Sequence, residues 1–283
     1  MQLTRRFVFR GNASALAGQI YRPKTIIVDL DGASSLGVSG GRSQSQIKGR
    51  SFGDIIKFGS AFTLAQGLFD DEKKAYDVSN RKDRSQIDLD ATTTVTSELR
   101  ELAVGRKPVF TARRIRGTLV SRKPDGSGEP SIAPERDTVI QDVAIGGFGL
   151  TVSLNVSLFQ KYDTRSKIVA AADDPKFVKS YSNHLVTGAT IDGQPMSRPG
   201  LVARYGVIYT TIVKEIQWDG KPYPGARIDG HSVVVPDLGT IFFGELFVAS
   251  SERRLTMVRF DLGSPDGGWV DGGGVDTNGS FYP

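Results

Sequence analysis

Alternation of apolar and polar side chains recurs along the chain far more often than apolar residues spaced three and four apart. Residues 92–96 (Thr-Thr-Thr-Val-Thr) are almost purely β-branched, which favours a pleated surface over a helix. We expect strands at residues 3–10, 25–30, 54–58, 92–102, 109–121, 138–145, 149–159, 185–191, 203–218, 227–235, 240–249 and 254–261. The sequence therefore predicts an all-β fold, mainly antiparallel and sandwich-like, with one or two short helices and long loops.

Helical signals are confined to two stretches. Residues 173–181 open with Asp-Asp-Pro, which is a helix start, and we expect about two turns there. Residues 61–75 place Phe62, Leu68 and Phe69 on one helical face, although a glycine interrupts the pattern. The sequence predicts no layer of helices.

A stretch rich in proline and glycine, residues 124–137, is the best candidate for a boundary. It could join two β-rich halves, 1–123 and 138–283. It could equally be a long hairpin loop within one body formed by residues 1–283, and we favour this single body.

The numbers of glycines and cysteines limit which folds and which catalytic or metal sites are possible. The chain has 33 glycines among 283 residues, which indicates many tight turns. It has no cysteine, which excludes disulfides, thiolate metal sites and a cysteine nucleophile. We find no secretory signal and no apolar stretch long enough for a spanning helix, so we expect a cytoplasmic location.

The segment K-T-I-I-V-D-L-D-G-A, residues 24–33, is open to two interpretations. It resembles the first motif of the haloacid-dehalogenase-like phosphatases. That resemblance implies that Asp29 attacks phosphorus, that Asp31 protonates the leaving group, and that both hold magnesium. The other motifs of that family, and its α/β framework, are missing from the pattern.

The second interpretation of this segment is a hairpin turn. Asp-Gly occurs seven times in the chain, and several copies stand between apolar or β-branched runs. The pair suits both positive-φ positions of a type I′ turn. We therefore favour a turn at Asp31 over a catalytic strand end.

Glu245 and the two histidines are weak candidates for chemistry. Glu245 stands among aromatic residues, where its pKa could be raised for acid catalysis, with Asp237 as a second carboxylate. His184 and His231 lie in no recognisable metal or nucleophile spacing.

A further acidic feature is a set of carboxylates spaced five apart in the glycine-rich C-terminal stretch, which could bind calcium. A glycine-rich tail that packs Trp269 and Tyr282 onto the body is the alternative that we favour. The carboxylates in question are Asp266, Asp271 and Asp276.

Basic residues concentrate between positions 100 and 123. This stretch holds eight cations and one acid, a net +7, whereas the whole chain carries +5. Arg114 and Arg116 share one strand face, and Arg113 shares the other with Ile115. The candidate anion-binding residues are Arg100, Arg106, Lys107, Arg114, Arg116, Arg122 and Lys123. A solvated cationic edge is the alternative, and stacking aromatics that would support nucleic-acid binding are not interleaved there.

We expect a non-enzymatic β-rich binding or assembly protein, which engages copies of itself as a homo-oligomer or an anionic or glycan partner. The alternative is a hydrolase on a β scaffold that acts on carbohydrate or phosphate esters.

Overall fold

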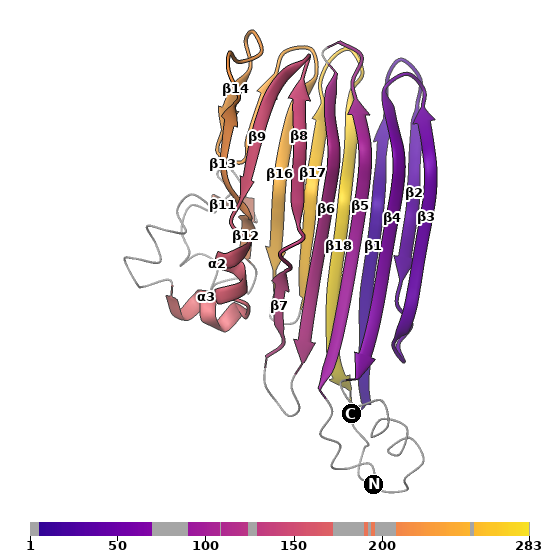
Figure 1. The fold of residues 1–283 in the computed structure, drawn as a ribbon, viewed down its shortest axis with the longest axis vertical. Coiled ribbons are helices and arrows are strands. Elements are labelled where there is room, and N and C mark those ends of the chain that lie inside the picture. The colour runs from indigo at the N-terminus through magenta and orange to yellow at the C-terminus, as the bar shows by residue number, and fades with distance from the viewer. Residues whose placement is uncertain are drawn as a thin grey trace, which may run out of the picture.

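The fold consists of two antiparallel sheets that face each other (Figure 1). The computed structural model describes residues 6–69, 90–107, 109–123, 129–171, 190–191, 194–195, 208–249 and 252–282. Within them, a small hairpin and two short helices accompany the sheets: β10 (Thr190–Ile191), β11 (Gln194–Pro195), α2 (Val156–Lys161) and α3 (Arg165–Ala171). The predicted antiparallel, all-β sandwich with few short helices is confirmed. None of the described helices is long and apolar enough to cross a membrane.

The first sheet has eight strands and pairs the N-terminal strand with the C-terminal one. Its order is β14 (Arg227–Asp229), β15 (Ser232–Val235), β16 (Gly239–Val248), β17 (Glu252–Leu262), β18 (Gly268–Tyr282), β1 (Arg6–Ile20) and β2 (Ile26–Ser35), with β12 (Ile208–Thr211) paired to β16. The C-terminal stretch, which we expected to be a tail, is β18, an interior strand between β17 and β1. The tail prediction is therefore wrong, and Trp269 is exposed.

The second sheet also has eight strands, and it lies in front of the first in Figure 1. Its order is β13 (Val213–Trp218), β9 (Phe148–Leu154), β8 (Val139–Ile145), β6 (Phe110–Lys123), β5 (Ala91–Val104), β4 (Ile56–Phe69) and β3 (Gly41–Phe52), with β7 (Ser131–Pro134) paired to β6. Both sheets contain strands from each side of residues 124–137. A cut in that segment would therefore divide both sheets.

Apolar side chains from both sheets form the core between them. Phe110 of β6 packs edge-to-face on Phe260 of β17, with ring centroids 4.9 Å apart, and lies 6.2 Å from Phe243 of β16. All three rings are fully buried. Contacts between aromatic rings of facing sheets fix the spacing of a sandwich core.

The alternation of inward and outward side chains reverses along a line that crosses both sheets, which we call the reversal line. In β5, Leu99 and Leu102 both point into the core although they are three residues apart. Glu101 between them has φ 55, in the left-handed region. The strand registers place the members of the line opposite one another: Asp142, Arg113, Glu101, Gly59 and Gly49 in the second sheet, and Gly244, Met257, Gly273, Ala15 and Gly32 in the first.

On the reversal line, alternate strands of the first sheet carry a residue with positive φ, and in the second sheet β5 and β8 do so. In the first sheet these residues are glycines, Gly32, Gly244 and Gly273, with φ of 67, 58 and 72. In the second sheet they are Glu101 and Asp142. A left-handed residue shifts the phase of the side chains that follow it, so apolar residues on both sides of the line face the core.

The phase shift overturns the prediction for Arg113. Strict alternation would place Arg113 on the same face as Ile115. Ile115 is buried in the core, whereas Arg113 is exposed and pairs with Asp142 on the outer face. Both Arg113 and Asp142 lie on the reversal line, where the alternation breaks.

The helix predicted at 61–75 is wrong where the structure describes it, because residues 61–69 belong to β4. Its backbone pairs with β3 on one side and β5 on the other, and this pairing overrides a short apolar periodicity. The helix predicted at 173–181 lies outside the described residues. The strand expected at 149–159 ends early, because α2 begins at residue 156.

The Asp-Gly pairs serve two different purposes. Asp219, Asp229 and Asp266 lie at or beside connections between strands, as expected for turns. Asp31 and Asp271 instead lie inside β2 and β18, so the hairpin turn predicted at Asp31 is wrong. The glycine after Asp31 has φ 67 because it lies on the reversal line. The pairs at Asp125 and Asp192 include residues outside the described ones.

Gly273→Ala tests the steric demand of the reversal line. An added Cβ would lie 2.8 Å from Met257 Cβ at a position with φ 72, so overlap adds to backbone strain. We expect a loss of about 2–4 kcal/mol in unfolding free energy, measured by urea denaturation. Gly147→Ala is the matched control: its φ is 87 but nothing lies within 4 Å, so only the backbone cost of about 1 kcal/mol applies. Equal losses in the two variants would contradict this account.

Candidate anion-binding site

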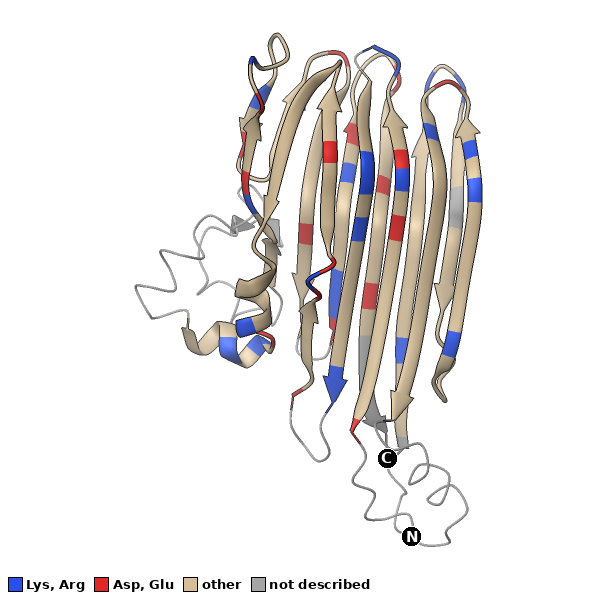
Figure 2. Ribbon diagram, viewed as in Figure 1, with Lys and Arg blue, Asp and Glu red and all other residues tan. Residues whose placement is uncertain are grey.

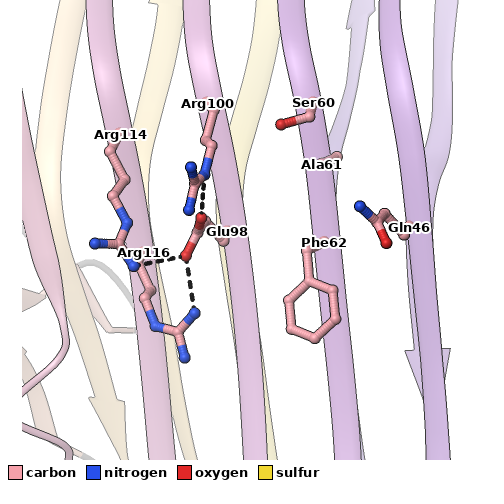
Figure 3. Close-up of a pocket in the computed structure, with 8 residues that line it drawn as sticks. All are labelled: Gln46, Ser60, Ala61, Phe62, Glu98, Arg100, Arg114 and Arg116. Carbon is pink, nitrogen blue, oxygen red and sulfur yellow. Dashed lines mark hydrogen bonds and ion pairs between the residues drawn. The ribbon is translucent and has the colours of Figure 1, made fainter.

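Glu98 lies at the centre of three arginines on the outer face of the second sheet (Figure 3). Its carboxylate accepts hydrogen bonds from Arg100 Nε at 2.5 Å, and from Arg114 and Arg116 at 2.8 Å each. The Glu98 side chain is 6% exposed, whereas the three arginines are 57%, 32% and 21% exposed. The guanidinium groups therefore cover the carboxylate and remain open to solvent.

Strand register builds this cluster from two neighbouring rows of outward side chains. Residues opposite one another on adjacent strands lie about 5 Å apart, and residues two apart on one strand share a face. The first row is Gln46, Phe62, Glu98 and Arg116, and the second is Lys48, Ser60, Arg100 and Arg114, each running from β3 to β6. The site is therefore fixed by backbone pairing rather than by a loop.

The electrostatics hold Glu98 ionised. Burial raises its pKa, but the hydrogen bonds from Arg116, Arg114 and Arg100 outweigh burial and lower the pKa to about 2. The pKa of Arg116 is raised, because its bonds to Glu98 and its interactions with Asp137 outweigh the effect of burial. At neutral pH the cluster keeps one negative and three positive charges.

An open pocket of about 440 Å³ lies beside the cluster. Its lining contains three arginines and one glutamate, a net +2, together with polar and aromatic side chains from β3 and β4: Gln46, Ser60 and Phe62. Among the described residues, the Gln46 amide makes no hydrogen bond and neither does Ser60 Oγ. Arg114 Nε is buried without a partner. The positive charge of the arginines and the free polar groups of Gln46 and Ser60 therefore face the same space.

The structure brings together three of the seven predicted anion-binding residues: Arg100, Arg114 and Arg116. The other four lie toward the two ends of β6, so the cations follow the length of that strand (Figure 2). Arg106 pairs with Asp54 at 3.1 Å, and Arg122 lies 3.4 Å from Glu135. Lys107 is exposed in the β5–β6 connection, and Lys123 is buried. The predicted stripe is one local cluster plus separate cations.

Four residues that line the pocket were not predicted from the sequence as part of a site: Gln46, Ser60, Phe62 and Glu98. Alternation along β5 places Glu98 on the face of Arg100, and that signal was available. The strand β3 was not predicted, and β4 was assigned in part to a helix. The partners from these two strands therefore had no predicted position.

Glu245 lies in a second polar cluster, on the outer face of the first sheet. Arg259 donates to both of its oxygens, at 2.7 and 2.9 Å, and His231 Nε2 lies 3.5 Å away. Burial raises the pKa of Glu245, but the hydrogen bonds from Arg259 and His231 outweigh it and lower the pKa to about 2. The pKa of Glu245 is therefore lowered, whereas a general acid would need a raised one. Asp237 has φ 61 in the β15–β16 connection, and His184 lies outside the described residues.

The C-terminal carboxylates do not converge. Asp271 and Asp276 are five residues apart on one strand, a separation of about 16 Å, and Asp266 lies in the β17–β18 connection. Asn12 donates a hydrogen bond to Asp276 at 2.9 Å. In the part of the chain that the structure describes, no group of three or more His, Asp or Glu residues could hold a metal ion.

The phosphatase interpretation lacks its framework. Asp29 and Asp31 lie in β2, which pairs antiparallel with β1 and is followed by another strand, β3. The resemblance requires a strand that leads into a helix of an α/β layer. The side chains of both aspartates lie outside the described part of the structure.

Comparison with known proteins gives one match. A family model described as "Domain of unknown function (DUF8256)" matches residues 7–249. No curated protein matches, and no solved structure does. The matched range includes all the residues that line the pocket.

Asp271→Asn tests the electrostatics of the second cluster. Burial raises the pKa of Asp271 from 3.8 to about 6. The positive charge of Arg259 lowers this pKa, whereas the negative charges of Glu245 and Asp261 raise it further. Because the carboxyl loses its proton more readily in the unfolded state than in the folded state, the unfolding free energy falls as pH rises from about 4 to 6. Above pH 6 we expect the unfolding free energy of Asp271→Asn to exceed that of wild type by about 1–2 kcal/mol, after allowing for solvent contact, so the variant unfolds at a higher temperature.

That advantage of Asp271→Asn should vanish near pH 4, where the wild-type carboxyl is protonated in the folded state. Thermal unfolding between pH 4 and 8 checks this. Asp54→Asn removes a carboxylate with a 70% exposed side chain and serves as the control. A pH-independent difference between wild type and Asp271→Asn would contradict titration of the buried carboxyl as the cause.

Proposed function

This chain belongs to the DUF8256 family, and we propose that it is a non-enzymatic binding protein whose arginine pocket takes an anionic ligand. The supporting observation is the convergence of Arg100, Arg114 and Arg116 on one buried carboxylate at an open pocket. Planar guanidinium groups present several donors in a fixed arrangement that suits carboxylate, phosphate or sulfate.

Glu98 acts in this proposal as the group that orients the arginines. Three like charges would separate if no carboxylate lay between them. Its two oxygens accept one hydrogen bond from each guanidinium, and a guanidinium has five N–H donors. Arg116 also donates to Asp137. The donors that remain for a ligand therefore lie on Arg100 and Arg114, and they are held in place before it arrives.

The alternative, a hydrolase, has less support. Glu245 and Arg259 form a two-point ion pair, which accounts for the carboxylate without catalysis. The phosphatase-like segment lies in an antiparallel sheet. Glycoside hydrolysis typically uses two carboxyl groups around a shared substrate position, whereas Glu98 and Glu245 are each bound to arginine on the outer faces of different sheets.

Arg114→Gln tests the proposed pocket. Sodium sulfate is titrated into the protein at constant ionic strength, and binding is followed by calorimetry. We expect saturable binding to wild type, weakened about tenfold or more in the variant, because a hydrogen bond to a charged group contributes about 1.5–3 kcal/mol. Arg122→Gln removes a cation from the same strand outside the pocket lining and should bind like wild type. Equal weakening in both variants would argue for general charge attraction.

Self-association is a second candidate function, favoured by the open side of the sandwich. Within the described residues, β2 and β3 each pair on one side only, and they lie next to each other (Figure 1). Ile27 on β2 and Val38 in the β2–β3 connection are 64% and 68% exposed. Long unpaired edges with exposed apolar residues are surfaces for strand addition.

Light scattering after size exclusion tests this second candidate. The strand β3 carries three cations and no acid, so two copies repel at low salt and we expect association to increase with salt. The double variant Ile27→Lys, Val38→Lys should remain monomeric at concentrations where wild type dimerises. Leu68→Lys, at a 40% exposed position on β4, is the control. A wild-type monomer at all salt concentrations would exclude this candidate.

A further inference from the structure

The residues beside the arginines indicate the chemistry of the ligand, and this inference rests on the proposed anion-binding function. We infer that the pocket takes an acidic saccharide, a sugar ring that carries a carboxylate. Three features carry the inference: the aromatic ring of Phe62, the unused polar groups of Ser60 and Gln46, and the arginine cluster itself.

Phe62 supplies a surface suited to the face of a sugar ring. It projects from the outer face of β4, directly opposite Glu98 on β5, and is only partly buried. The face of an aromatic ring is electronegative, so it attracts the polarised C–H groups of a pyranose. A bare inorganic anion gains nothing from such a surface. The position of Phe62 in the same row as the anion-binding residues therefore favours a saccharide, whose ring can contact the aromatic face, over a bare anion.

Gln46 and Ser60 supply hydrogen bonds of the kind that hydroxyl groups need. The Gln46 amide both donates and accepts, and so does the Ser60 hydroxyl. Neither side chain is engaged with another described residue. Gln46 lies opposite Phe62, and Ser60 lies opposite Arg100. Hydroxyl-binding groups and the aromatic face therefore lie on the β3–β4 side of the pocket, and the cationic groups lie on the β5–β6 side.

This division matches a ligand with two chemically different parts. The carboxylate would contact Arg114 and Arg100, whose guanidiniums are the more exposed ones. The ring and hydroxyls would extend across β4 toward β3. The distance across the four strands is about 14 Å, so a sugar ring and its carboxylate fit within one row. The net charge of +2 in the lining favours an anionic sugar over a neutral one.

The experiment compares four probes on wild type: sodium sulfate, acetate, glucose and glucuronate, titrated at constant ionic strength. We expect glucuronate to bind about tenfold or more tightly than acetate, and glucose to bind more weakly than glucuronate. Phe62→Ala should weaken glucuronate several-fold and leave sulfate unchanged. Leu64→Ala, which changes the next outward residue on the same strand, should leave both probes unchanged.

Gln46→Ala gives a second measurement that does not depend on how Phe62→Ala folds, because Gln46 lies exposed on the edge strand β3. It should weaken glucuronate but not sulfate. If sulfate binds through Arg114 while glucuronate binds no better than acetate, the saccharide inference is wrong and the anion site stands. If sulfate shows no binding that depends on Arg114, the proposed function fails as well.

Discussion

The reversal line is the constraint on which the rest of this structure depends. Long strands in a sandwich must keep apolar side chains inward along their whole length, yet this sequence changes its apolar phase midway. The change is absorbed at residues in the left-handed region on several of the strands, such as Gly273 and Glu101. Because the line crosses facing sheets near the same height, with Gly273 close to Ile115, the two halves of the sandwich share a single core.

The same line borders the arginine pocket. The residues just past it, such as Phe58 and Leu102, turn into the core, so the outward row that ends at Arg114 has no bulky apolar neighbours beyond it. Gly59 and Gly49 on the line carry no side chain, and the Glu101 side chain lies over Gly59. A backbone feature that serves core packing therefore also shapes the surface where charge is concentrated.

Periodicity in the sequence was sufficient to predict the fold class and most of the strands, because alternation and β-branched content depend on one strand at a time. It failed for β18, where the space beside two glycines is filled by Val258 and Met257 of the neighbouring strand β17. It failed for Arg113, because φ at Glu101 and Asp142 is set by the sheet as a whole. Only the arginines of the site were predicted, because cations are concentrated in that stretch of the sequence. Their partners Glu98 and Phe62 come together only through strand register.

Strand register also determines which kind of anionic ligand the basic stretch of the sequence could bind. A strand of 14 residues spreads its cations over about 45 Å, and acids neutralise them locally, as Asp142 does for Arg113 and Asp54 for Arg106. No continuous track of positive charge remains along the described strands for a long polyanion, whose affinity depends on many phosphate contacts. What remains is a local excess of positive charge around Glu98, where the arginine hydrogen-bond donors are held in fixed positions. In the function that we propose, this site would select its ligand by hydrogen-bond geometry, which favours a small anion with matching polar groups over a long charged polymer.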